Sequence, residues 1–207
     1  MRLRQGRRDK RRRGGGDTAN LAEVDASAWA ELEGAAADPQ SAFRYLNLCS
    51  VDAGGRPQAR MVVLRRADAA RRILEIHTDV RSPKWQEISA NPLVTILGYG
   101  PQPKVQLRLQ GSAELHGPAS ESATEAWSLL PRSTRSTYMG GPPGDEIGEQ
   151  PASEAAGADA DGRAFFGVLI FRAETLDWFQ LRHADNRRAV FAYDKLGALT
   201  SSRWVNP

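Results

Sequence analysis

Short apolar runs of strand type recur along most of this chain. Three show the pattern most clearly: residues 73–78 (ILEIHT), residues 93–99 (LVTILGY) and residues 104–117, which include the alternating stretch VQLRLQ. Strict alternation buries one face of a strand and leaves the other face polar. A turn segment, AGGRPQ, separates two further runs, which predicts a hairpin. The remaining strand-type runs are residues 43–51, 59–65, 165–181 and 189–194.

Helical periodicity is confined to three segments, at residues 27–36, 83–90 and 120–130. In the first, Trp29 and Leu32 lie three residues apart and share one face. The strands therefore outnumber the helices, and no regular alternation of strand and helix is present. This pattern predicts a mainly β (α+β) fold, an antiparallel barrel with a few attached helices.

Charge and composition set two segments apart from the rest. Residues 1–13 hold eight basic residues and one acidic residue, a charge of +7 against +3 for the whole chain, so the remainder carries −4. We expect residues 1–20 to be a disordered basic tail, residues 21–207 to form one domain, and a segment at about 140–163, rich in Gly, Pro, Ala and acids, to be a mobile loop.

The tail has two interpretations. A basic run can bind nucleic acid or anionic lipid, or it can be a solvated extension. The second is favoured because the rest of the chain offers no matching basic face. Nucleic acid is therefore an unlikely partner except through the tail.

Features that the sequence lacks limit the cellular compartment and the kinds of site that we expect. No run approaches the roughly 18 apolar residues of a membrane helix. Cys49 is the only cysteine, which excludes an internal disulfide and a cysteine-based metal site and favours a reducing, cytoplasmic compartment. Dinucleotide and phosphate-loop fingerprints and zinc-protease motifs are absent. No metal is expected.

The segment HTDVRSPKW joins a predicted strand to a predicted helix. Ser82 is a good N-cap and Pro83 suits the first helical position, so a helix is expected to begin here with its free N–H groups directed outward. Helix N-termini attract anions, and Arg81 and Lys84 add full charges. A phosphate would suit this place. The alternative is an ordinary capped helix with two solvent-facing cations.

A second candidate group lies on the preceding strand, in ARMVVLRR. Arg60 and Arg65 bracket an apolar stretch whose side chains and backbone would suit a flat ring, although a buried strand with charged ends is the simpler alternative. Gln106, on the polar face of the alternating strand, is suited to hydrogen-bonding a ring nitrogen or carbonyl. No pattern resembles a protein nucleophile with its base. We therefore expect no catalytic side chain, and a cofactor that carries the chemistry.

Three ordered motifs resemble one family. ARMVVLRR, IHTDVRSPKWQEISANP and VQLRLQGSAE are similar to the pyridoxamine 5'-phosphate oxidase family, the FMN-binding split β-barrels, and TDVRSPK is especially similar to its oxidase-like flavin proteins. The resemblance extends more weakly over Trp29–Pro207 and leaves out the basic tail. It implies a split antiparallel β-barrel and a homodimer with FMN bound between the subunits.

The resemblance also assigns roles to individual residues. Arg60 and Lys84 would hold the FMN phosphate together with Ser82, and Arg81 would replace a charge that is lost where Pro83 stands. Gln106 would contact the flavin ring. A late arginine near the flavin would be Arg188, with Arg187 an equally defensible alignment. The other expected cofactor-binding residues are Met61, Val62, Val63 and Leu64 beside the ring, Arg65 toward the substrate, and His77 and Thr78 near the ribityl chain and phosphate.

The departures from the family pattern concern the substrate. The Arg-x-His spacing of the oxidase is absent from LRHADNRR, and Trp127 and Leu130 stand where the oxidase helix offers a Tyr and an Arg to substrate phosphate. The expected function is an FMN-dependent oxidoreductase acting on a small amine or alcohol, pyridoxamine phosphate included. The alternatives are an NAD(P)H-dependent flavin reductase and a flavin- or haem-binding protein without turnover.

Overall fold

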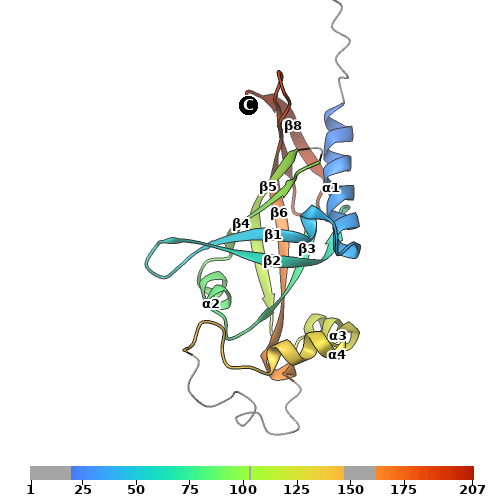
Figure 1. The fold of residues 1–207 in the computed structure, drawn as a ribbon. Coiled ribbons are helices and arrows are strands. Elements are labelled where there is room, and N and C mark those ends of the chain that lie inside the picture. Colours follow the sequence, from blue (N-terminus) through green and yellow to red (C-terminus); the bar gives the residue numbers. More distant parts are fainter. Residues whose placement is uncertain (1–19, 103, 147–161) are drawn as a thin grey trace, which may run out of the picture.

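Eight antiparallel strands form one sheet, and six of them close into a barrel (Figure 1). The computed structural model describes residues 20–102, 104–146 and 162–207. The strand order is β3-β2-β1-β4-β5-β6-β7-β8, and β3 pairs again with β6, which closes the ring. The predicted mainly β, split-barrel fold is confirmed. The strands are β1 (Tyr45–Val51), β2 (Pro57–Asp68), β3 (Ile73–Asp79), β4 (Leu93–Gly100), β5 (Val105–His116), β6 (Phe166–Gln180), β7 (Arg187–Tyr193) and β8 (Leu199–Val205).

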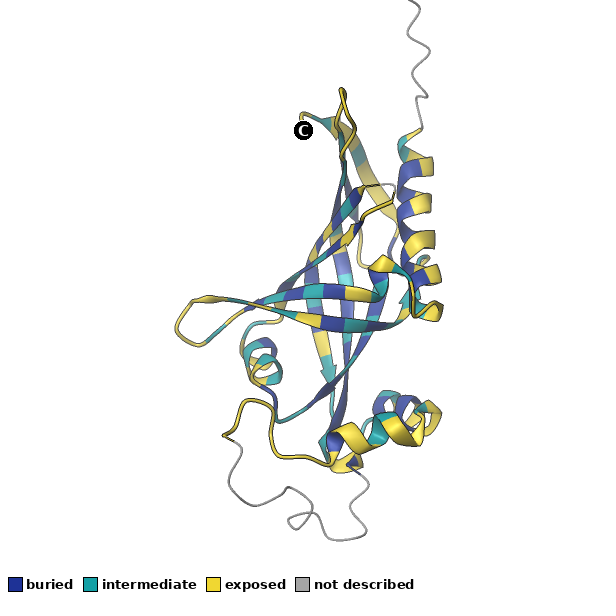
Figure 2. Cartoon of the chain, in the orientation of Figure 1, coloured by how far each residue is buried: buried dark blue, intermediate teal, exposed yellow. Residues whose placement is uncertain are grey.

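Alternation along each strand fills the barrel with aliphatic and aromatic side chains. Leu48, Leu64, Ile76, Ile96 and Leu109 come from five different strands, and each is fully buried. Figure 2 shows the consequence, because buried and exposed positions alternate along the ribbons. This burial fixes the register, since a shift by one residue would turn the apolar set outward.

Helix α1 (Leu21–Ala37) packs mainly against β2 of the barrel and also contacts β8 (Figure 1). The predicted helix, residues 27–36, starts six residues too late. Asn20 caps the helix and forms a capping box with Glu23, so the first two turns are stabilised by backbone capping rather than by apolar periodicity. Trp29 and Leu32 are fully buried, as their spacing predicts.

Three more α-helices lie at the other end of the barrel (Figure 1). Helix α2 (Pro83–Ala90) has the predicted bounds, and α3 (Glu121–Leu129) lies within the predicted segment 120–130. Helix α4 (Arg132–Arg135) was not predicted and adds one short turn. Trp127 of α3 packs with Tyr138 and Phe166 in a second, smaller apolar cluster, which holds this helical unit against β6. The three 3-10 helices are Ala42–Arg44, Ser136–Tyr138 and Arg163–Phe165.

The two segments expected to be disordered or mobile fall largely outside the described residues. Residues 1–19 of the tail and residues 147–161 of the acidic loop are not described, and Asn20 already belongs to the start of α1. Those two expectations therefore stay predictions. None of the helices in the described ranges is long and apolar enough to cross a membrane.

Gly111 permits a bulge where β5 and β6 change register. The pairing shifts between Gln110 and Gly111, and a Cβ at Gly111 would overlap the carbonyl oxygen of Arg172 on β6. We expect Gly111→Ala to lower the thermal unfolding midpoint clearly, measured by circular dichroism, because the backbone on both sides is held by the sheet. Gly117→Ala is the control, because a Cβ there meets nothing within 4 Å. Equal midpoints for the two variants would contradict this account.

Candidate functional site

No side chain caps the start of α2, where the N–H groups of Trp85 and Gln86 donate to the carbonyl oxygen of Ser82. Ser82 occupies the N-cap position, but its hydroxyl donates to the carbonyl oxygen of Asp79 at 2.7 Å and makes no cap hydrogen bond. Lys84 Nζ donates to the same hydroxyl at 3.3 Å, and Thr78 Oγ1 lies 3.4 Å from it. Pro83 carries no N–H of its own. The sequence predicted a helix start open to an anion; no described hydrogen bond uses the backbone N–H of Lys84, and the anion site itself stays a prediction.

Arg60 lies beside the same helix and shares its charge with a carboxylate. Its guanidinium forms an ion pair with Glu87 of α2 at 2.7 Å and donates to the Ser50 hydroxyl, which itself donates to Glu87. The pKa of Lys84 is lowered, chiefly by burial and next by the nearby positive charge of Arg60. Two cations are thus held close together at the helix start, with Glu87 as the compensating group.

Arg81 is directed away from this pair. It hydrogen-bonds both carboxylate oxygens of Asp79, at 3.0 and 2.6 Å, and also donates to the carbonyl oxygen of Tyr138. Its guanidinium carbon lies 3.6 Å from the centroid of the Phe165 ring. The side chain therefore ties the β3–α2 turn to the helical unit, and its charge is compensated by Asp79.

The side chains of strand β2 point alternately into and out of the barrel, and part of one edge of the strand has no hydrogen-bonded neighbour strand in the described sheet. Met61 is 58% exposed, whereas Val62 and Leu64 are buried in the barrel. Of the four apolar side chains expected beside a flat ring, only Met61 and Val63 face outward, so Val62 and Leu64 can contribute only their backbone. Residues 57–63 pair with β1, while the pairing with β3 begins at Leu64. That edge of β2 is open within the described sheet.

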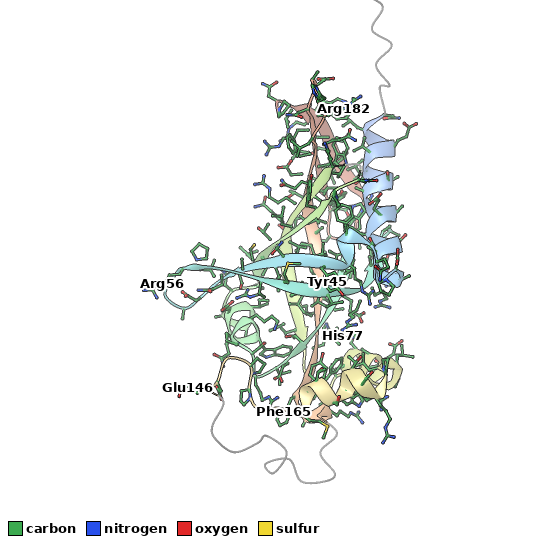
Figure 3. The ribbon with its side chains drawn as sticks, viewed as in Figure 1. Tyr45, Arg56, His77, Glu146, Phe165 and Arg182 are labelled. Atoms are coloured by element: carbon green, nitrogen blue, oxygen red, sulfur yellow. The ribbon has the colours of Figure 1, made fainter. Side chains whose placement is uncertain are left out.

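Two buried nitrogens without a described hydrogen-bond partner lie farther along β2 and β3. Arg65 falls at a bulge between Leu64 and Arg66, and its Nε is one of them. The pKa of Arg65 is lowered, mainly by burial. His77 Nε2 lies 3.0 Å from a carboxylate oxygen of Glu75, and its Nδ1 is the second. Figure 3 places His77 between the barrel and α3.

Gln106 and Arg188 share the outer face of the sheet. Gln106 pairs with Phe179, which pairs with Arg188, so the three side chains are in one row across β5, β6 and β7. Arg187 has the opposite parity: it lines a cavity of about 350 Å³ beside α1, and its guanidinium stacks on Trp204. Of the two arginines that the sequence left open, Arg188 is therefore the one on the face of Gln106.

The candidate residues form two groups within one chain. Thr78, Ser82, Lys84 and Arg60 gather at the start of α2, whereas Gln106 and Arg188 lie on strands β5 and β7. Strands β1 and β4 separate β2 from β5. At about 4.8 Å per strand, roughly 14 Å of sheet lies between β2 and β5. A single chain thus presents two parts of a site rather than one closed pocket.

The sequence reasoning missed the acidic partners of these cations. Glu87 pairs with Arg60, Asp79 with Arg81, and Asp177 with Arg188. Glu87 follows Lys84 by three residues on one helix, a spacing that signals a contact with Lys84 and not the observed ion pair with Arg60. The pairing of Asp177 depends on contacts between strands, for which the sequence alone gives no signal.

Among the described residues, no three His, Cys, Asp or Glu side chains are grouped so as to hold a metal ion. The described site groups instead consist of cationic, hydroxyl and amide side chains with open backbone N–H groups. That donor set is suited to an anionic, aromatic ligand.

Comparison with known proteins identifies the class. Residues 26–117 match the family model described as the FMN-binding domain of pyridoxamine 5'-phosphate oxidase. Pyridoxine/pyridoxamine 5'-phosphate oxidase 2 of Arabidopsis thaliana is 25% identical over 79% of this chain and 87% of its own length. The oxidase of Caulobacter vibrioides is 33% identical, but the match spans 40% of this chain and only 35% of the relative.

Solved structures confirm the fold. A pyridoxamine 5'-phosphate oxidase-related, FMN-binding protein from Nostoc punctiforme superposes with a TM-score of 0.72 at 24% identity, covering 87% of this chain and 96% of that one. PhzG from Burkholderia lata has a TM-score of 0.68 at 17% identity, covering 92% and 95%. Fold and motifs together define an FMN-binding split barrel. Residues 26–117 are similar to the FMN-binding domain of the pyridoxamine 5'-phosphate oxidase family, and this match supports FMN as the cofactor.

The described residues fit this cofactor on their own chemistry. The helix start with Lys84 and Arg60 suits a phosphate, because two cations and the backbone N–H of Lys84 lie there. The open edge of β2, at residues 57–63, offers backbone groups to a planar ring. Where each site residue contacts FMN remains a proposal.

Proposed function

We propose that this protein is an FMN-dependent oxidoreductase acting on a small amine or alcohol. The observation that carries the proposal is the pair of cations at the open start of α2, where Lys84 is half-buried beside Arg60. Glu87 and Asp79 offset part of this charge, and an anion that completes the site stabilises the half-buried lysine beside Arg60 further. The FMN phosphate is that anion.

The roles of the residues follow from their positions. The start of α2, with Ser82, Lys84 and Arg60, holds the phosphate, and Thr78 supports the Ser82 hydroxyl. Bound FMN supplies hydride transfer at its reactive ring nitrogen. Met61 and Val63 border the ring with their side chains, while the backbone of β2 offers it hydrogen bonds. The remaining proposed contacts are Val62 and Leu64 through their backbone, Arg65 toward the substrate, His77 near the ribityl chain, Gln106 and Arg188 at the ring, and Arg81 beside the phosphate, where it pairs with Asp79.

We further propose that the working form is a homodimer with FMN between the subunits. The two groups of candidate residues lie apart in one chain. A second copy of the chain would therefore bring its Gln106 and Arg188 close to the residues at the start of α2. The outer face also exposes large apolar side chains: Tyr45 (52%), Met61 (58%) and Tyr99 (46%). Light scattering coupled to size exclusion tests this, and a monomer that retains stoichiometric FMN would contradict it.

Spectroscopy and substrate addition test the function. The purified protein is expected to be yellow, with one FMN per chain. Anaerobic addition of pyridoxamine phosphate, other small amines and alcohols, or NADPH then identifies the reductant by bleaching of the flavin. Bleaching by an amine or alcohol supports the proposal, bleaching by NADPH alone indicates a reductase, and no bleaching indicates a binding protein without turnover.

The lowered pKa of Lys84 predicts a pH dependence of FMN binding. The lysine must be protonated to hold the phosphate, so affinity is expected to fall as pH rises, at a lower pH than an ordinary lysine would require. Fluorescence titration of FMN between pH 7 and 10 measures this. Lys84→Arg is the matched control, because its guanidinium stays charged throughout the range. Identical pH profiles for the two proteins would refute the role of Lys84.

A further inference from the structure

The outer face of the sheet carries a cluster of three charges beside Gln106. Asp177 of β6 is 6% exposed and accepts two hydrogen bonds from Arg188, from Nε at 2.9 Å and from a terminal nitrogen at 2.7 Å. A terminal nitrogen of Arg108, from β5, donates to the same carboxylate at 2.5 Å. One buried carboxylate is thus held between two arginines on neighbouring strands.

The geometry restricts Arg188 more than an ordinary surface ion pair would. A side-on, two-point contact fixes the plane of the guanidinium, whereas a single contact leaves it free to rotate. Arg188 lowers the pKa of Asp177 more than any other neighbour, and Asp177 in turn raises the pKa of Arg188. Both bonds use one side of the guanidinium, so its other terminal nitrogen is directed away from the carboxylate.

The register places this arrangement on the proposed flavin side. Arg108 pairs with Asp177 in one row, and Gln106, Phe179 and Arg188 form the next row on the same face. The cluster has a net charge of +1 beside the glutamine that is proposed to contact the ring. A positive charge at this place favours the reduced flavin, because reduction adds negative charge to the ring system.

We propose that Asp177 is a positioning residue that, supported by Arg108, fixes the guanidinium of Arg188 against the flavin and thereby raises the reduction potential of bound FMN. This inference rests on the proposed function. It assigns a role to Asp177, which holds Arg188, and a role to Arg108, which donates to the same carboxylate.

The reduction potential of bound FMN separates positioning from a direct effect of charge. We would measure it by dye equilibration in holoprotein carrying Asp177→Asn, Arg188→Gln or both changes. If Asp177 acts only as a nearby negative charge, its neutralisation raises the potential. If it positions Arg188, the potential of Asp177→Asn falls toward that of Arg188→Gln, and Asp177→Asn has little further effect in the Arg188→Gln background.

Two further variants serve as controls for the measurement of the reduction potential. Glu174→Gln neutralises an exposed carboxylate on the same strand and is expected to leave the potential unchanged. Asp177→Glu keeps the charge but moves the carboxylate, so positioning predicts a smaller fall and a pure charge effect predicts none. An unchanged or raised reduction potential in Asp177→Asn, or no shift of the potential in Arg188→Gln, overturns the inference. If these variants still bind one FMN per chain, the proposed function stands. Wild-type protein that binds no FMN overturns both.

Discussion

Replacing Arg60 and Lys84 together by alanine is expected to abolish stoichiometric FMN binding while the barrel remains folded. Each charge-assisted contact to a phosphate contributes about 1.5–3 kcal/mol, so losing both weakens binding by about a hundredfold to ten-thousandfold. The double variant also leaves Glu87 near the phosphate without its partner Arg60. Repulsion from this carboxylate adds to the loss.

The measurement is the FMN content of the purified protein and its dissociation constant by fluorescence titration. Both side chains lie at the end of the barrel rather than in its core, so circular dichroism should show native secondary structure. Lys195→Ala, in the exposed turn between β7 and β8, removes a positive charge far from α2 and should retain FMN. Full FMN occupancy in the double variant would contradict the assignment of Arg60 and Lys84 to the FMN phosphate.

Asp25→Asn is expected to destabilise the fold by about 3–5 kcal/mol, because it leaves Arg72 as a mostly buried charge without its carboxylate. Asp25 of α1 is 4% exposed and pairs with Arg72 at 2.7 Å. It also accepts a hydrogen bond from the Tyr193 hydroxyl, which in turn accepts one from Trp29 Nε1 at 3.0 Å. Burial and the hydrogen bond to Asp25 raise the pKa of Tyr193, so its phenol stays protonated and able to donate.

Thermal unfolding checks this second expectation. For a chain of this size the loss corresponds to a fall in midpoint of about 6–20 °C. Glu31→Gln makes the same neutralisation on an exposed position of α1 and should change the midpoint little. A midpoint of Asp25→Asn within 2 °C of wild type, taken as about 1 kcal/mol or less, would show that the network does not anchor α1.

Element prediction succeeded where the signal was local. Alternation in VQLRLQ predicted β5, and Ser82 with Pro83 predicted the first residue of α2. It failed at the start of α1, where the capping box of Asn20 and Glu23 begins the helix before the apolar periodicity does. Helix α4 was missed because a single turn carries too little periodic signal.

For the candidate site too, local motifs were predictable from the sequence, and contacts between distant segments were not. Arg60, Ser82 and Lys84 could be named from motifs, because a resemblance transfers residue by residue. That Arg60 is paired with Glu87, and Arg81 with Asp79, required the folded chain. The sequence could not decide between Arg187 and Arg188. Neighbouring residues of a strand face opposite sides of the sheet, and the pairing of Arg188 with Phe179 shows that Arg188 lies on the outer face with Gln106.

By itself, the sequence indicated the class of fold, a resemblance to one family and the cofactor, because short-range alternation, helix-start residues and ordered motifs are all local properties of the chain. The tertiary structure decided how the charges are compensated and which side chains share a face. Ion pairs such as Asp177 with Arg188, and the separation of Gln106 from the start of α2, depend on strand order and register. Those are set by the burial of the whole barrel core, which no local stretch of sequence specifies.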